Sequence, residues 1–375
     1  MIYLDYSANT PVDARVLEQF CAVERRCIGN ANSHHQAGSA AKAEIDAATI
    51  KIASLLGVQP AEIIYTSGAS EANNFALKGL ARLSRHAGRH IISTPLEHSS
   101  VSGTLTALQE QGYEIDLLDV KQDGTVDLEH LKDLLRPDTI CVAVTLVDSE
   151  LGVVQPVQEI AAILKAYPHC HLHVDATQAV GKIPVSFEGV DTMSLTAHKF
   201  YGLNGIGLLI KRRNLALEPL IHGGESTTIY RSGTPTVALA SSLACALNLA
   251  VTDLPGRVDH VAKLNAELRA ALSTYPLVRI NSPDHAIPHV LNLSVQNVKG
   301  TIFQRELDAK GVCVSVKSAC SSDGLPSRAV FAVSRDRRNA LSSWRISLSH
   351  LTTEDESKAF LQAFDVCYRE LTAVH

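Results

Sequence analysis

The sequence lacks the segments that direct a chain into or across a membrane. Its first residues, MIYLDYSANTP, contain neither a basic stretch nor a long apolar run, so they do not have the features of a signal peptide. No uninterrupted apolar stretch approaches the roughly 20 residues that a membrane-spanning helix needs. We therefore expect no membrane association.

The cysteines lack the spacing of a metal site or a disulfide framework. All eight are scattered along the chain without a CxxC pair, at positions 21, 27, 141, 170, 245, 313, 320 and 367. This pattern indicates neither a zinc site nor a set of structural disulfides, so we expect no metal. A reducing, cytoplasmic location follows most simply.

Charge is also scarce, and no single sign dominates it. Charged residues make up 19% of the chain, the formal net charge is −5 and the pI is near 6.3, so we expect no direct binding of nucleic acid. Hydrophobic residues make up 46% of the 375 residues. This composition is typical of a globular protein with a substantial core and argues against a disordered chain.

From about residue 60, short β-rich runs alternate with helical stretches. The runs expected to form strands are 62–66, 90–93, 113–118, 140–145 and 171–175. Such alternation predicts an α/β fold with a mostly parallel sheet and helices on both faces. Ligand sites in such sheets lie at the carboxyl ends of the strands. Ser67, His98, Ser149 and Asp175 all lie at or just after a strand's end, so we expect them to share one site.

Two helical stretches, at about 236–253 and 257–274, lead into a final part with different patterning. The run Asp-Leu-Pro-Gly at 253–256 is expected to separate them. We predict a large domain over residues 14–256 and a small domain formed by residues 1–13 and 257–375.

Lys199 stands in the stretch SLTAHKFYG, between a histidine and a bulky aromatic residue. An apolar setting lowers the pKa of a lysine and makes its amine a nucleophile. The alternative is an ordinary lysine at the end of a strand.

Three other features point to the same chemistry. Ser67-Gly68-Ala69-Ser70 lies at a strand-to-helix turn, where backbone N–H groups can hold an anion; a plain tight turn is the alternative. Asp175 ends an apolar strand, and its partner is either a protonated heterocyclic nitrogen or an internal Arg or Lys. The run 231–234 (Arg-Ser-Gly-Thr) either holds another anionic group or is a solvated loop. A phosphate cradle, a carboxylate for a pyridinium and a lysine for an aldehyde are the three anchors that pyridoxal 5′-phosphate requires.

Several motifs in this order carry a resemblance to a known family. They are YLDYSANTPVD, TSGASEANN, LEHSS, HVDATQAVGKIP, AHKFYGLNGIG, HGGESTTIYRSGT, VKSACSS and SSWRISLSHLTTEDE. The chain resembles the cysteine desulfurases, which belong to the class-V aminotransferase-like enzymes of pyridoxal phosphate fold type I. The resemblance implies a mostly parallel, seven-stranded sheet between helices, a smaller α+β C-terminal domain, and a homodimer.

The resemblance also implies residue roles. The residues that would hold or surround the cofactor are Ala69, Ser70, His98, Ser149, Asp175, Gln178, Thr196, His198, Lys199 and Thr234. Lys199 would form a Schiff base and move protons at the substrate α-carbon. Asp175 would pair with the pyridine nitrogen, and His98 would stack on the ring. Gln178 would hydrogen-bond the phenolic oxygen.

The remaining roles concern phosphate and substrate. Ala69, Ser70, Thr196 and His198 would hold the phosphate. Thr234 would reach the phosphate bound in the neighbouring subunit. Arg345 would bind the substrate carboxylate through both nitrogens of its fork, with Asn30 assisting nearby.

Cys320 decides which reaction the resemblance implies. It lies in a run rich in Ser and Gly, which predicts an exposed, mobile loop, and Lys317 would help to lower its pKa. Its thiolate would take the sulfur of L-cysteine, leaving L-alanine and a persulfide for an acceptor protein in iron–sulfur cluster assembly or in thio-modification of tRNA or DNA. The alternatives are a selenocysteine lyase, another pyridoxal phosphate C–S lyase, or a non-catalytic sulfur-transfer scaffold.

The chain departs from the family pattern near this site. Ser149 stands where relatives have an asparagine, and Asp148 adds a carboxyl group beside it. We expect these two changes to shift the absorbance of the bound cofactor. Lys317 replaces a glycine, which should reduce the freedom of the loop.

Overall fold

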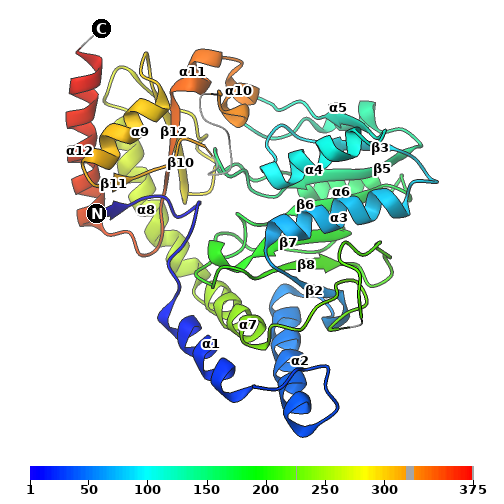
Figure 1. The fold of residues 1–375 in the computed structure, drawn as a ribbon. Helices are drawn as coiled ribbons and strands as arrows, with labels where there is room; N and C mark the ends of the chain where they lie inside the picture. The colour runs from blue at the N-terminus through cyan, green and yellow to red at the C-terminus, as the bar shows by residue number, and fades with distance from the viewer. Residues whose placement is uncertain (225, 318–324, 374–375) are drawn as a thin grey trace.

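The computed structural model describes residues 1–224, 226–317 and 325–373 (Figure 1). Its centre is a seven-stranded sheet. The strands, in spatial order, are β2 (Ile63–Thr66), β8 (Gly207–Lys211), β7 (Thr192–Thr196), β6 (His171–Asp175), β5 (Thr139–Thr145), β3 (His90–Ser93) and β4 (Glu114–Leu117). β8 runs antiparallel to β2 and β7, and every other neighbouring pair is parallel. The predicted α/β fold with a mostly parallel sheet is therefore confirmed.

Helices cover both faces of this sheet. They are α1 (Ala14–Arg26), α2 (Gln36–Leu56), α3 (Ala69–Leu83), α4 (Ser99–Gln109), α5 (Leu128–Leu134), α6 (Val157–Leu164) and α7 (Val237–Thr252). Along β5, Cys141 and Ala143 belong to the core shared with α3 and α4, whereas Val142 and Val144 belong to the core shared with α6 and α7. Successive side chains of a strand point to opposite faces, so a strand buried on both faces is apolar throughout.

A second group of elements packs around its own aromatic core. It contains the antiparallel sheet β12 (Ser343–Ser347), β10 (Val290–Val295) and β9 (Val278–Ile280), and the parallel pair β1 (Ile2–Tyr3) and β11 (Val312–Cys313). Its helices are α8 (Leu254–Leu272), α9 (Gly300–Ala309), α10 (Arg328–Ser334), α11 (Arg337–Ser342) and α12 (Glu354–Thr372). Trp344 stacks on Phe303 with ring centroids 5.1 Å apart. The N-terminal strand thus pairs with a strand from the last quarter of the chain (Figure 1). We propose that the large and small domains meet between residues 256 and 257.

Several expected boundaries differ by one to three residues, and two of these differences have a local cause. Glu62 lies in the short 3₁₀ helix η1 (Pro60–Glu62), where its carboxylate accepts a hydrogen bond from the Gln59 backbone N–H, so the strand begins one residue later. The expected 253–256 breaker is reduced to Asp253, because α8 begins at Leu254 and the first turn of a helix tolerates Pro255. Within the described part of the chain, no single helix is long and apolar enough to cross a membrane; only α7 and α8 taken together are, and they meet at a bend of 65°.

Candidate active site

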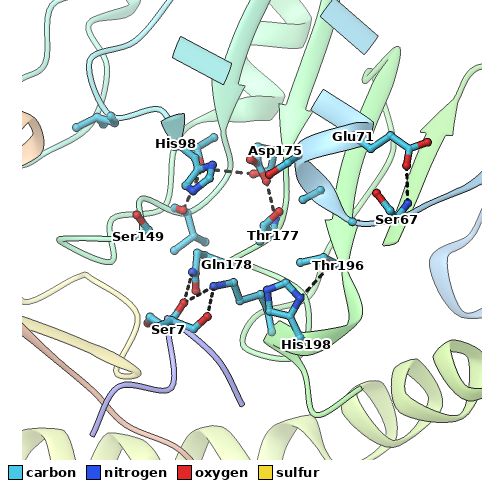
Figure 2. Close-up of a pocket in the computed structure, with 18 of the residues that line it drawn as sticks. Ser7, Ser67, Glu71, His98, Ser149, Asp175, Thr177, Gln178, Thr196 and His198 are labelled. Carbon is cyan, nitrogen blue, oxygen red and sulfur yellow. Dashed lines mark hydrogen bonds between the residues drawn. The ribbon is translucent and has the colours of Figure 1, made fainter. Parts of the chain in front are cut away.

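A cavity of about 340 Å³ lies at the carboxyl ends of the parallel strands (Figure 2). Small-molecule sites in proteins typically occupy about 300–1,000 Å³. The predicted site residues that line it are Ala69, Ser70, His98, Ser149, Asp175, Gln178, Thr196, His198, Lys199 and Arg345. The structure therefore brings most of the predicted residues together.

Asp175 is buried at the end of β6 and is held by neutral donors. Asn73 Nδ2 donates to its Oδ2 at 2.8 Å, and the Thr177 backbone N–H donates to its Oδ1 at 2.9 Å. Among the ion pairs of the described residues, none joins Asp175 to an Arg or Lys, so the internal-cation alternative is not found. A buried carboxylate without a cation can pair with a protonated heterocyclic nitrogen.

Asn73 is the partner of Asp175 that the sequence did not reveal. Its Oδ1 is placed 3.0 Å from His173 Nε2 and accepts from Ser194 Oγ, which leaves Nδ2 to face Asp175. Burial lowers the pKa of His173 to about 4, so the ring is neutral. The only signal in the sequence is that Asn73 belongs to the motif TSGASEANN, because an asparagine in a helix is otherwise not unusual.

Lys199 ends the short 3₁₀ helix η2 (Ala197–Lys199), directly after β7. Its Nζ donates to the carbonyl oxygens of Ser7 and Ala8, at 2.6 Å each. Gln178 Nε2 donates to the same Ser7 oxygen at 2.9 Å. The amine therefore faces carbonyl groups of the N-terminal segment, rather than the apolar setting that its flanking residues suggested.

An anion cradle lies at the start of α3. Gly68 is the N-cap of this helix and makes no side-chain cap, so the first backbone N–H groups have no side chain to satisfy them. Gly207 packs against this turn, and a Cβ there would lie 2.7 Å from Gly68 Cα. On the other side, Thr196 Oγ1 lies 3.1 Å from His198 Nδ1.

Both histidines of the cavity are neutral near pH 7. Burial, followed by the charge of Lys199, lowers the pKa of His198 to about 4. Burial also lowers the pKa of His98, although Asp175 opposes this. His98 caps α4, because its Nδ1 accepts from the Ser100 backbone N–H at 3.1 Å. The uncharged His98 ring can lie against an aromatic cofactor or accept a proton.

Asp148 was expected to add negative charge beside the cofactor, but the structure places its carboxyl group in a buried turn. It is completely buried, and one carboxylate oxygen accepts from the Leu151 backbone N–H. Burial raises its pKa to about 7. Asp148 therefore shapes the turn after β5 and brings less negative charge to the site than an exposed aspartate would.

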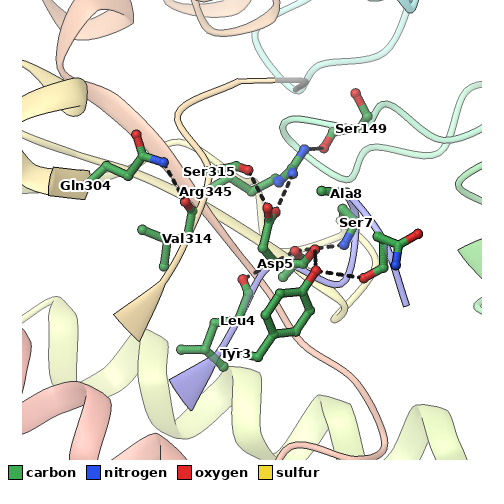
Figure 3. Close-up of polar contacts among 12 residues, drawn as sticks. Tyr3, Leu4, Asp5, Ser7, Ala8, Ser149, Gln304, Val314, Ser315 and Arg345 are labelled. Atoms are coloured by element: carbon green, nitrogen blue, oxygen red, sulfur yellow. Dashed lines mark hydrogen bonds and ion pairs between the residues drawn. The ribbon is translucent and has the colours of Figure 1, made fainter. Parts of the chain in front are cut away.

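Arg345 lies at the wall of the cavity, held by groups from distant parts of the chain (Figure 3). Its Nη2 forms an ion pair with Asp5 Oδ1 at 3.0 Å, and its Nη1 donates to the Ser149 carbonyl at 2.8 Å. Asp5 Oδ2 accepts from Ser315 Oγ at 2.7 Å. Asp5 belongs to the motif YLDYSANTPVD, but no sequence pattern predicts its ion pair with an arginine 340 residues away.

Three predicted residues do not line the cavity. Asn30 lies exposed between α1 and α2, where its Oδ1 accepts from the Asn32 backbone N–H, so within one chain it does not line the cavity that contains Arg345. Thr234 lines a separate cavity of about 240 Å³ with Ser67 and Arg231. Cys320 lies outside the described residues.

The cavity residues fit pyridoxal phosphate. The uncapped turn before α3 suits the phosphate, Asp175 suits the pyridinium nitrogen, and Lys199 Nζ suits the aldehyde. Bound there, the cofactor would supply an electron sink for the substrate α-carbon.

Comparisons with known proteins agree with this fit. The family model described as aminotransferase class-V matches residues 2–360. The chain is 39% identical over 364 residues to a cysteine desulfurase IscS of Proteus mirabilis, covering 95% of this chain and 89% of the relative. It is 36% identical over 381 residues to a NifS/IcsS protein homolog of Lactobacillus delbrueckii, covering 100% of this chain and 99% of the relative. The solved structure of a NifS-like protein matches with a TM-score of 0.92 and 35% identity over 99% of both chains. The predicted family, fold type and cofactor are confirmed: the chain belongs to the class-V aminotransferase family of pyridoxal phosphate enzymes, among the NifS- and IscS-like cysteine desulfurases.

Proposed function

We propose that this protein is a cysteine desulfurase. L-Cysteine and the Cys320 thiol are converted to L-alanine and a Cys320 persulfide, and the outer sulfur then passes to an acceptor protein. The observation that carries the proposal is one cavity that combines Lys199, the buried Asp175 and Arg345. The relatives named cysteine desulfurase support the choice of substrate.

Arg345 suits the substrate carboxylate because its position is fixed before substrate arrives. Asp5 and the Ser149 carbonyl hold its two terminal nitrogens, and the side chain is 2% exposed. A carboxylate entering the cavity would meet a guanidinium that has already lost its rotational freedom. The amino acid would therefore bind with its α-carbon directed toward Lys199.

Lys199 and His98 are the groups that would move protons. Lys199 Nζ would take the proton from the substrate α-carbon and return one to the α-carbon of alanine. His98 is neutral and lines the same cavity, so it can accept or donate a proton near the substrate thiol.

A second cavity supports the role assigned to Cys320. It has a volume of about 320 Å³ and shares Leu96, His98 and Ser149 with the first cavity. Lys317 and Leu325, the described residues on either side of segment 318–324, also line it. The two described residues that flank segment 318–324 therefore lie next to the proposed site of sulfur removal.

The same proposal includes a homodimer, in which Thr234 reaches the phosphate bound in the neighbouring subunit. It also includes a sulfur-acceptor protein and a cytoplasmic location, where the reducing environment keeps thiols available for persulfide chemistry.

Product analysis with L-cysteine and a reductant tests the activity. We expect equal amounts of alanine and sulfide. Pyruvate and ammonia in place of alanine would instead identify an eliminating lyase, and no product from protein that shows the visible cofactor band would favour a non-catalytic scaffold.

Replacing Cys320 by serine tests the thiol. We expect Cys320→Ser to lose sulfide release while the visible absorption of the bound cofactor is unchanged. Cys245→Ser is the matched control, because Cys245 lies on α7 outside the cavity lining and burial raises its pKa. Full turnover by Cys320→Ser would remove this residue from the mechanism.

A further inference from the structure

A buried lysine, Lys182, lies beside the site and has no assigned role. It is 6% exposed and follows Gly181, whose φ of +75° disfavours a side chain and where a Cβ would lie 3.0 Å from Phe200 Cβ. Lys182 Nζ donates to Gln178 Oε1 at 2.5 Å. A buried ammonium group normally requires a carboxylate, yet no ion pair of the described residues includes Lys182.

The other charged and titratable groups near Lys182 are cationic or neutral. Burial, followed by the charges of Lys199 from η2 and Arg345 from β12, lowers the pKa of Lys182 to about 7. His289, just before β10, is kept neutral, since burial and Lys182 lower its pKa to about 3. The small cavity that Lys182, Lys199 and His289 share measures about 10 Å³. Such a volume holds about one water molecule.

The contact with Lys182 decides which way the Gln178 amide points. An ammonium group only donates, so it must face the amide oxygen. A flipped amide would direct its own N–H groups at the ammonium and leave both without an acceptor. Gln178 Nε2 is therefore directed to the cavity side, where Ser7 O takes one of its hydrogens at 2.9 Å (Figure 2).

We propose that Lys182 is a positioning residue that locks the Gln178 amide with Nε2, rather than Oε1, toward the cofactor. The second N–H of Nε2 then remains for the phenolic oxygen, the contact that the family resemblance implies for Gln178. The inference thus rests on the proposed function, and it explains why a lysine without an ion pair among the described residues is kept in the interior despite its cost.

A double-mutant cycle of Lys182→Met and Gln178→Ala tests this inference. The measured quantity is the dissociation constant of pyridoxal phosphate, obtained by reloading cofactor-free protein. We expect Lys182→Met to weaken binding about fivefold, the factor associated with one ordinary hydrogen bond. In the Gln178→Ala background it should have no further effect. An equal loss in both backgrounds, or no loss in either, would overturn the inference.

Two other readouts separate positioning from a merely structural role. In Lys182→Met, the pH at which the visible band changes should rise, because the phenolic oxygen loses its donor. Unfolding of the cofactor-free variant should be unchanged or require more denaturant, because an unpaired buried charge has been removed. A large loss of apo stability with an unchanged band would show a structural lysine. If Lys182→Met does not fold, Lys182→Gln enters the same cycle, with an intermediate effect expected because its amide can both donate and accept.

The proposed function can fail separately. If wild-type protein releases no alanine and sulfide but the cycle is non-additive, the desulfurase proposal fails and the positioning role stands. If wild-type protein is active but the effects are additive, only the positioning role fails.

Discussion

The ion pair between Asp5 and Arg345 should contribute strongly to stability, and Asp5→Asn tests it. Removing one partner of a fully buried pair costs about 3–5 kcal/mol. The Asp5 side chain is 18% exposed, and asparagine keeps an oxygen that can accept from Arg345 Nη2, so the cost is smaller. We expect the free energy of unfolding to fall by about 2 kcal/mol, the value of a hydrogen bond to a charged group.

Asp13→Asn is the matched control on the same N-terminal segment. Asp13 pairs with Arg15, whose side chain is 58% exposed, and such pairs contribute only about 0–1 kcal/mol. Asparagine also preserves the N-cap of α1. Denaturant unfolding of both cofactor-free variants gives the comparison. If Asp5→Asn is no less stable than Asp13→Asn, the burial argument is wrong. In the enzyme assay, we expect only Asp5→Asn to have a raised KM for L-cysteine, because Asp5 holds Arg345 in place.

Other predictions concern packing, pH and the cofactor. Gly207→Ala should destabilise the protein by about 1–3 kcal/mol and weaken pyridoxal phosphate binding, because its Cβ would lie 2.6 Å from the Leu195 carbonyl. Gly103→Ala, in the open middle of α4, should stabilise by about 0.5–1 kcal/mol, and the same loss in both variants would contradict the packing argument. Burial raises the pKa of Glu97 to about 8, above the unfolded value of about 4.3, so stability should fall as the pH rises between these values. Glu97→Gln should reduce that fall, and an unchanged pH profile of unfolding would refute the assignment. Ser149→Asn should alter the pH dependence of the visible band; identical titrations would show that Ser149 does not affect the cofactor.

The parts of the fold predicted well are those that depend on local pattern. β3 (HIIS) and β6 (HLHVD) have the predicted bounds, because each is a short run containing Ile, Leu or Val between turn residues. Asp175 and Lys199 lie in one cavity because the carboxyl ends of parallel strands meet at one edge of the sheet. The alternation of strands and helices therefore predicted the edge of the sheet at which the site lies.

The missed features depend on contacts between distant segments. Ser7 and Ala8 contribute backbone carbonyls to Lys199, and backbone groups leave no signal in residue identity. The pairing of Asp5 with Arg345 requires β1 to lie beside β11 and near β12, which no periodicity predicts. Lys182 belongs to the motif HVDATQAVGKIP, but its burial depends on how the turn after β6 packs, which the sequence does not indicate.

Borohydride reduction of the holoprotein, followed by peptide mapping, tests the central claim most directly. The reduction should fix the pyridoxyl group on Lys199 and on no other residue. A label on Lys182 or any other lysine, or protein that takes up no label, would contradict the account of the site given above.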